Sequence, residues 1–201
     1  MNTTTTPRIT FLPQPFWTAL VCLLTGLFML QPASAVTLIP TFDSRSLPNG
    51  PTNSNNQDLT IGPLSASQYY RSYMTFDLSA LTTNDTASAA TLKLINSTAN
   101  EGNTSALPQV FTLFQVSSDW NGTVAPGPEG TALATVNITP AVGNDAQNIE
   151  FSGTNLVNAF NGNLGGILYL GIKSDKEGAT NRSFCNFQSS EDPSKPTLTT
   201  I

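Results

Sequence analysis

The stretch YRSYMTFDL, residues 70–78, combines aromatic and β-favouring side chains and contains no glycine or proline. Its residues alternate in character, and alternate side chains of a strand point to opposite faces. Met74 and Phe76 then lie on one face, while Arg71 and Asp77 share the other. Charges inside such a strand need partners, because an unpaired buried charge is costly. We therefore expect a central strand of a β-sandwich with polar anchors built into it.

The two charged residues of this strand are too far apart to pair with each other. They are separated by about 20 Å along an extended chain, since each residue advances a strand by roughly 3.3 Å. Glu191, or a backbone carbonyl, is the partner that we expect for Arg71. Asp77 is expected to cap the turn that follows at Ser79-Ala80. Arg71, Asp77 and Glu191 are thus predicted to be structural residues.

The rest of the chain outlines further strands and a single helical segment. The helical pattern covers residues 153–160, where Leu156, Val157 and Phe160 lie on one face. No βαβ alternation occurs, so the predicted fold class is all-β: an antiparallel β-sandwich, jelly-roll-like, with one short helical turn. The polar residues 43–57 are predicted to form a long loop. The nine further predicted strands are 36–42, 58–61 (ending at Gly62-Pro63), 89–95, 110–116, 131–138, 149–152, 166–172, 182–188 and 196–201.

Residues 1–35 have the pattern of a secretory signal peptide. Arg8 precedes a mostly apolar run over 16–30, which leads to the cleavage motif Ala33-Ser34-Ala35. The alternative is a membrane anchor, but the run is shorter than the ~20 residues that a spanning helix needs. We therefore expect cleavage after Ala35, secretion to the exterior or cell surface, and no membrane anchor afterwards. Residues 36–201 are expected to form a single domain.

Composition excludes several classes of function. The chain has 13 acidic and 8 basic residues and no histidine. Without a basic patch to meet phosphates, nucleic acid is not an expected partner. The absence of imidazole leaves few residues for acid/base work and excludes histidine-ligated metals. Cys185 is the only cysteine after the leader, so no intramolecular disulfide can form, and its alternation with Phe184 and Phe187 predicts a buried thiol.

Taken in order, six pieces of the chain resemble the DNRLRE family, a group of secreted β-sandwich domains related to carbohydrate-binding modules. The resemblance implies the same fold and a role at surfaces and with polysaccharides. The family often has a second tryptophan soon after the position of Trp120, and this chain lacks it. The matching pieces are Asp43 with the Asn/Gly-rich stretch after it, 59–62, 71–79, 89–94, 116–120, and 187–191 followed by 196–198.

Four aromatic residues are candidates for binding a glycan. Trp120 is the only tryptophan after the leader, and its indole either stacks on a sugar ring or closes the sandwich core. Tyr69, Tyr70 and Tyr73 surround Arg71 in the sequence. If the three tyrosines and Arg71 cluster in a groove, their side chains also suit the β-elimination chemistry of a polysaccharide lyase.

A structural calcium ion is the only cofactor that the sequence suggests. Asp43, Asn53 and Asp58 lie in or beside the polar stretch 43–57 and carry the oxygen ligands that calcium takes. Their spacing matches no defined calcium loop, so a solvated loop is the alternative.

The leading hypothesis is a secreted, non-catalytic β-sandwich that binds a polysaccharide or cell-surface glycan, or serves in the extracellular matrix. The first alternative is a polysaccharide lyase or glycoside hydrolase, whose paired carboxylates would be spatial rather than sequential. The second alternative is a structural matrix or filament subunit. A groove with carboxylates or Tyr and Arg favours an enzyme, exposed aromatics favour binding, and exposed sheet edges favour assembly.

The leader generates the first prediction. Secreted protein should begin at Val36, because the motif Ala33-Ser34-Ala35 ends at a signal-peptidase site. Intact-mass measurement of the secreted chain checks this. Recovery of residues 1–35 still attached, in a membrane fraction, would contradict it.

Overall fold

The computed structural model describes residues 35–47, 58–97, 103–117, 128–140, 142 and 147–201. The chain divides into two units, Met1–Ser34 and Ala35–Ile201, and the fold described below belongs to the second. Residues 1–34 of the expected signal peptide lie outside the described residues. Within the described ranges, no helix has the length and apolar character needed to cross a membrane.

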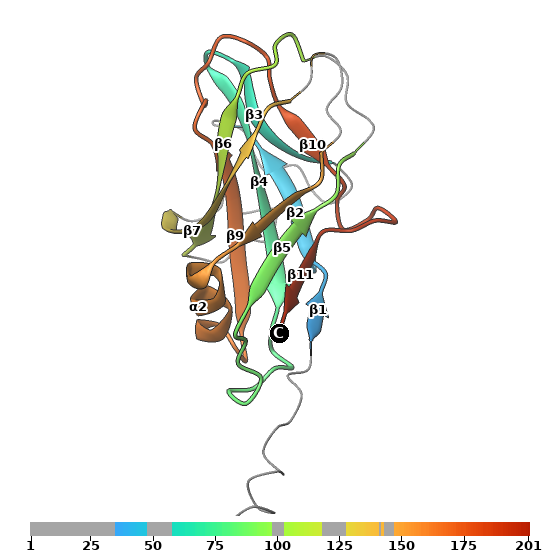
Figure 1. Ribbon diagram of the computed structural model, residues 1–201, viewed down its shortest axis with the longest axis vertical. Helices are drawn as coiled ribbons and strands as arrows, with labels where there is room; N and C mark the ends of the chain where they lie inside the picture. The colour runs from blue at the N-terminus through green and yellow to red at the C-terminus, as the bar shows by residue number, and fades with distance from the viewer. Residues whose placement is uncertain (1–34, 48–57, 98–102, 118–127, 141, 143–146) are drawn as a thin grey trace, which may run out of the picture. The chain divides into compact units, whose positions relative to one another are not determined.

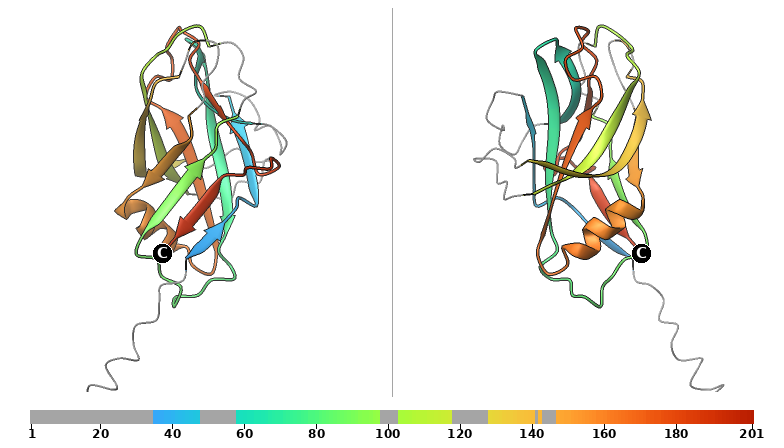
Figure 2. Two further views of the ribbon diagram at one scale, coloured as in Figure 1. Left: turned by 45° about the vertical axis from the view of Figure 1, so that its right-hand side comes forward. Right: turned by 90° about the vertical axis from the view of Figure 1, so that its left-hand side faces the viewer.

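Two antiparallel sheets face each other in this domain, which confirms the predicted β-sandwich (Figures 1 and 2). The smaller sheet has the order β1-β11-β5-β8, and the larger has the order β10-β3-β4-β9-β6-β7, with β2 paired to β4. The strands of the described chain are β1 (Val36–Leu38), β2 (Phe42–Ser46), β3 (Leu59–Ser65), β4 (Gln68–Asp77), β5 (Ala90–Leu94), β6 (Gln109–Val116), β7 (Glu129–Ile138), β8 (Ile149–Ser152), β9 (Ile167–Ser174), β10 (Cys185–Phe187) and β11 (Thr197–Thr200).

Strand β4 lies in the middle of the larger sheet, as the sequence predicts. On one side it pairs with β9 from Ser72 to Asp77. On the other side it pairs first with β3, through Tyr69 and Tyr70, and then with β2, through residues 71–75. Three strands therefore take their positions from β4.

The core lies between the sheets and collects the apolar face of each strand. Met74 and Phe76 of β4 are fully buried, as are Phe111 of β6 and Phe151 of β8. Burying one such side chain contributes about 1.5–3 kcal/mol, so this layer is the main force that holds the sheets together. The fully buried Leu59 and Ile61 of β3 and Phe187 of β10 extend the same core.

The one helix of the described chain, α2 (Thr154–Gly162), covers one end of the sandwich (Figure 2). It buries Leu156, Ala159 and Phe160, which confirms the predicted helical segment. The Asn161 side chain fixes the helix to the turn before β5, because it accepts from the backbone N–H of Ala87 at 2.8 Å and donates to the carbonyl of Ala87 at 2.9 Å.

Two predictions about the first third of the domain are wrong. The stretch 43–57 is not all loop, because β2 extends over Phe42–Ser46 beside β4. Strand β3 also continues through Gly62-Pro63 to Ser65. Gly62 adopts a positive φ of 123°, where the Ser183 carbonyl oxygen would lie only 2.7 Å from a Cβ. The missing side chain at Gly62 thus allows the close approach, and the Pro63 carbonyl accepts from Ser183 N–H at 3.0 Å.

A second, smaller apolar cluster lies on the outer face of the larger sheet. Tyr73, Phe114 and Val116 are its buried members, and Phe42 and Tyr169 pack against them. The Tyr73 and Phe114 rings meet edge to face, with centroids 6.2 Å apart. Strand β4 is therefore covered on both faces over its central residues.

Cys185 allows a direct test of the core. Its side chain is buried in β10, as its sequence context predicts. The native protein should react slowly with a thiol reagent and quickly once it is unfolded, because the reagent must reach the thiolate. Rapid labelling under native conditions would contradict the placement of β10.

Gly171 makes room for the outer cluster. A Cβ at this position would lie 2.4 Å from Cζ of Phe114, whose ring is confined by Tyr73. Gly171→Ala should destabilise the fold by about 1–3 kcal/mol, as overpacking does. Gly162→Ala is the matched control, since nothing lies within 4 Å of a Cβ there. Chemical denaturation should separate the two variants, and equal midpoints would contradict the packing.

Candidate functional site: the outer face of the larger sheet

Arg71 is held on the outer face of the larger sheet by Glu177. The guanidinium Nε and Nη2 donate to the two carboxylate oxygens of Glu177, each at 2.7 Å. Side-chain exposure is 25% for Arg71 and 17% for Glu177, so the pair is partly shielded from water. This two-point geometry is the strongest form of a charge-assisted hydrogen bond, and it raises the pKa of Arg71 further.

The expectation that Glu191 pairs with Arg71 is therefore wrong. Glu177 lies just after β9, the strand that pairs with β4. Which strand lies beside β4 is a matter of tertiary pairing, and the residues of β4 alone do not reveal it. A short acidic turn after an apolar strand was the only sequence signal for this partner.

Two more charged residues extend the ion pair across the sheet. Glu129 of β7 approaches Arg71, with 3.9 Å between Oε2 and Nη1, and also pairs with Lys173 of β9. Anions and cations therefore alternate from the turn after β9 to β7. We call Arg71, Glu177, Lys173 and Glu129 the ionic network.

Tyr69 adds an aromatic ring beside this network. The centre of the Arg71 guanidinium lies 5.5 Å from the centroid of the Tyr69 ring, which is half-buried. Tyr169 and Phe42 are also half-buried at the edge of the outer cluster. Tyr73 is only 6% exposed, and burial raises the pKa of its phenol. The centre of the face is thus closed at Tyr73, and Tyr69 is the partly accessible aromatic ring that lies beside the charged groups.

The three candidate tyrosines do not form one cluster. Tyr70 packs its ring edge to face against Phe184 at 5.6 Å, and the guanidinium of Arg45 lies over it at 5.4 Å. It therefore belongs to a different set of contacts from those of Tyr69 and Tyr73. A lyase base must give up its proton near the working pH, and the raised pKa of Tyr73 opposes this role.

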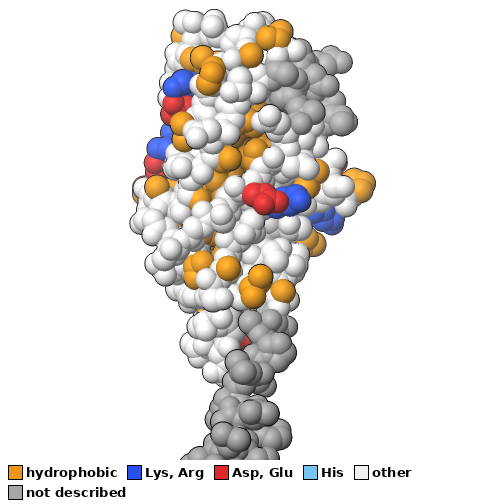
Figure 3. Space-filling view, viewed as in Figure 1, with side chains coloured by type: hydrophobic (Ala, Val, Ile, Leu, Met, Phe, Trp, Pro, Cys, Tyr) orange, Lys and Arg blue, Asp and Glu red, His pale blue; other side chains and the backbone are white. Residues whose placement is uncertain are grey.

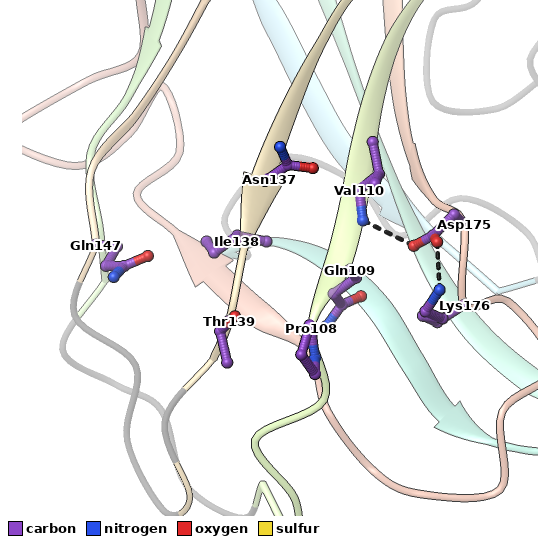
Figure 4. Close-up of a pocket in the computed structure, with 9 residues that line it drawn as sticks. All are labelled: Pro108, Gln109, Val110, Asn137, Ile138, Thr139, Gln147, Asp175 and Lys176. Carbon is purple, nitrogen blue, oxygen red and sulfur yellow. Dashed lines mark hydrogen bonds and ion pairs between the residues drawn. The ribbon is translucent and has the colours of Figure 1, made fainter.

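A pocket of about 500 Å³ lies where β6, β7 and the turn after β9 meet (Figure 4). In Figure 4, Asn137, Thr139 and Gln147 lie on one side of it, and Asp175 and Lys176 lie on the other. Asp175 accepts from the backbone N–H of Val110 at 2.7 Å and also pairs with Lys176. Amide, hydroxyl and charged groups thus line the pocket together with the apolar side chains of Pro108 and Ile138.

The pocket and the ionic network lie on neighbouring parts of the sheet. Lys173 and Asp175 are on the same side of the chain leaving β9, and Lys176 directly precedes Glu177. Figure 3 views another face of the molecule, where charged side chains are few and a red group lies beside a blue one. Among the described residues, Arg71, Lys93, Lys173 and Lys176 each form an ion pair with a carboxylate.

The remaining candidate residues have separate positions. Asp77 accepts from the backbone N–H of Ser79 at 2.8 Å, which confirms its predicted role as a turn cap. The hydrogen bonds with Ser79 lower the pKa of Asp77. Trp120 and Asn53 lie outside the described residues. Asp58 precedes β3, and its carbonyl accepts from the Thr60 hydroxyl at 3.4 Å.

Asp43 does not lie in a solvated loop, which was the alternative to a calcium site at this position. It lies in β2 with 0% exposure, and its Oδ2 accepts from the backbone N–H of Ser190 at 2.6 Å. Burial raises the pKa of its carboxyl group to about 7, against the lowering effect of the Ser190 hydrogen bond. Among the described residues, no group of three or more Asp, Glu, Cys or His side chains is arranged to hold a metal.

The ion pair of Arg71 can be tested by denaturation. Arg71→Ala should lower the free energy of unfolding by about 1–3 kcal/mol, because Glu177 is left partly buried and unpaired. Arg71→Lys should recover only part of this loss, since lysine lacks the planar fork.

Lys93→Ala is the control, because Lys93 and Glu150 form an exposed pair at 3.4 Å. Such a pair contributes at most about 1 kcal/mol. An Arg71→Ala midpoint equal to that of Lys93→Ala would contradict a structural role for Arg71.

Comparison with known proteins adds no family assignment. No family model matches the chain. Likewise, no curated protein is significantly similar to it. The resemblance to the DNRLRE family therefore remains an expectation, and the function is proposed from the geometry of the site.

Proposed function

We propose that this protein is a secreted, non-catalytic module that binds glycans on the outer face of its larger sheet. The observation that carries the proposal is the arrangement of Tyr69 beside Arg71 and Glu177, next to a polar pocket. An apolar ring face with fixed donors and acceptors at its edge is suited to a sugar, which has both apolar ring faces and hydroxyl groups.

The ionic network supplies those donors and acceptors. The guanidinium of Arg71 and the carboxylate of Glu177 already hold each other in place, so little side-chain entropy is lost when a hydroxyl binds. Glu129 and Lys173 continue the same alternation on the neighbouring strands. A preorganised set of paired charges offers hydrogen bonds to neutral hydroxyls without leaving a charge unpaired.

The balance of charge favours a neutral glycan. Arg71, Lys173 and Lys176 are the cations of this surface, and Glu129, Asp175 and Glu177 are its anions. Three positive and three negative groups give no net field to attract a polyanion. A uronic-acid or sulfated chain would have to displace a carboxylate that is already paired.

The size of the surface favours a chain over a single sugar. From β4 through β9 and β6 to β7 there are three inter-strand steps, which span about 14 Å at roughly 4.8 Å each. The pocket lies near the β6–β7 side of this path, where Asn137 and Thr139 present polar groups. The proposed ligand is therefore an oligosaccharide segment that extends from Tyr69 towards the pocket.

The alternatives from the sequence have less support on this surface. A glycoside hydrolase needs one carboxyl group that is protonated to act as an acid, whereas Glu129 and Glu177 both contact cations. A matrix subunit that assembles through sheet edges needs exposed apolar edges. The matrix-subunit alternative makes no use of the ring of Tyr69.

A glycan array followed by affinity electrophoresis in neutral polysaccharides tests the proposal. Tyr69→Ala and Asn137→Ala should each weaken binding about tenfold, which corresponds to about 1.4 kcal/mol. Lys93→Ala lies on the smaller sheet and should bind as the wild type does. Absence of binding to any neutral glycan, or unchanged affinity in both site variants, would overturn the proposal.

A further inference from the structure

Asp43 has one carboxylate oxygen that finds no hydrogen-bond partner. Its Oδ2 is bound by the backbone N–H of Ser190, but the buried Oδ1 has no partner in the described structure. A fully buried carboxylate oxygen without a donor is unusual, because its lost hydration is normally replaced. Since the residue is 0% exposed, bulk water does not supply the replacement.

Two amide oxygens in β10 and directly after it also lack a hydrogen-bond partner. Oδ1 of Asn186 and Oε1 of Gln188 are buried and without a partner. These residues precede Ser190, whose N–H contacts Asp43. Gln188 is two residues from Ser190, or about 7 Å along an extended chain, which is within reach of its long side chain. The segment that leads from β10 to Ser190 therefore carries a buried amide oxygen, that of Gln188, which needs a positive partner.

Negative charge accumulates at the same place. Glu191 and Asp192 both act electrostatically on Asp43. Asp192 is fixed by the backbone N–H of Ser189, which donates to its Oδ2 at 2.7 Å. Within the described ranges, no ion pair involves any of these three carboxylates. Arg45, also on β2, donates to Thr60 at 3.1 Å and lies over Tyr70 instead.

We propose that Asp43 binds a calcium ion through its unpartnered Oδ1, with the amide oxygen of Gln188 as a second ligand. Calcium accepts six to eight oxygen ligands from carboxylates, amide or backbone carbonyls and water. The side chains at this place supply oxygen and no thiolate or imidazole, which disfavours zinc and copper. Because no three-carboxylate cage is present among the described residues, water completes the coordination and Glu191 contributes mainly charge.

The ion would link two parts of the chain that are 147 residues apart, since Asp43 belongs to β2 and Ser190 to the connection before β11. Its expected effect is therefore on stability rather than on glycan binding. This site differs from the one that the sequence suggested. It retains Asp43, but its other ligand comes from the far end of the chain instead of from Asn53 or Asp58.

Thermal unfolding of the full domain, first stripped with a chelator and then titrated with calcium chloride, tests the inference. Calcium should raise the unfolding midpoint of the wild type, and isothermal titration should show one bound ion. Asp43→Asn keeps the shape of the side chain and an acceptor for Ser190, so it should fold but lose the calcium response. Asp85→Asn, an exposed turn residue that accepts from Thr82, should respond as the wild type does.

Gln188→Glu provides a gain-of-function test. A carboxylate in place of the amide should lower the midpoint in chelator and bind calcium at least tenfold more tightly. Absence of a calcium-dependent shift in the wild type would overturn the proposal. An equal shift in Asp43→Asn, or a Gln188→Glu variant that calcium does not stabilise, would also overturn it.

Discussion

Strand β4 must satisfy apolar surroundings on both of its faces, and much of the domain follows from this constraint. Its inner face meets the core through Met74 and Phe76. Its outer face places Tyr73 in the second cluster, against Phe114. A strand buried on both sides has little freedom to slip, because a shift of one residue exchanges its faces. The pairing of β2, β3 and β9 with β4 is thereby fixed, and the remaining strands of the larger sheet build outward from it.

Two charged residues of this tightly packed layer, Arg71 and Asp43, differ in how fully their polar atoms are paired. The charge of Arg71 is paired, because Glu177 accepts two short hydrogen bonds from its guanidinium. Asp43 is only half matched, because one oxygen has Ser190 and the other has no partner among the described residues. The first arrangement explains how a charged residue belongs in a central strand. In the second arrangement, the Oδ1 of Asp43 still lacks a partner, and a bound cation is the simplest group to supply one.

The proposed function depends on the first arrangement. A free arginine on a sheet face would attract anions, whereas a paired arginine presents ordered donors without a net charge. The accessible ring of Tyr69 and the polar pocket add the apolar and hydrogen-bonding parts of a glycan surface. The proposed calcium ion acts elsewhere, where it joins β2 to the chain after β10. Glycan binding and stabilisation by calcium are therefore assigned to different places on the larger sheet. Either proposal can be wrong without affecting the other.

The sequence alone determined the fold class and most of the strands. Alternation over residues 70–78 identified the central strand, and the polar side chain before Ser79 identified the turn cap at Asp77, because both depend on neighbours in the chain. Tertiary structure decided which groups meet. Glu177 pairs with Arg71 only because β9 lies beside β4, and Tyr70 separates from Tyr69 because adjacent residues of a strand face opposite ways. Strand β2 escaped prediction because its polar sequence, Phe42–Ser46, becomes a strand only by pairing with β4. Local pattern sets local conformation, but contacts between distant residues depend on the order of strands, which no single stretch contains.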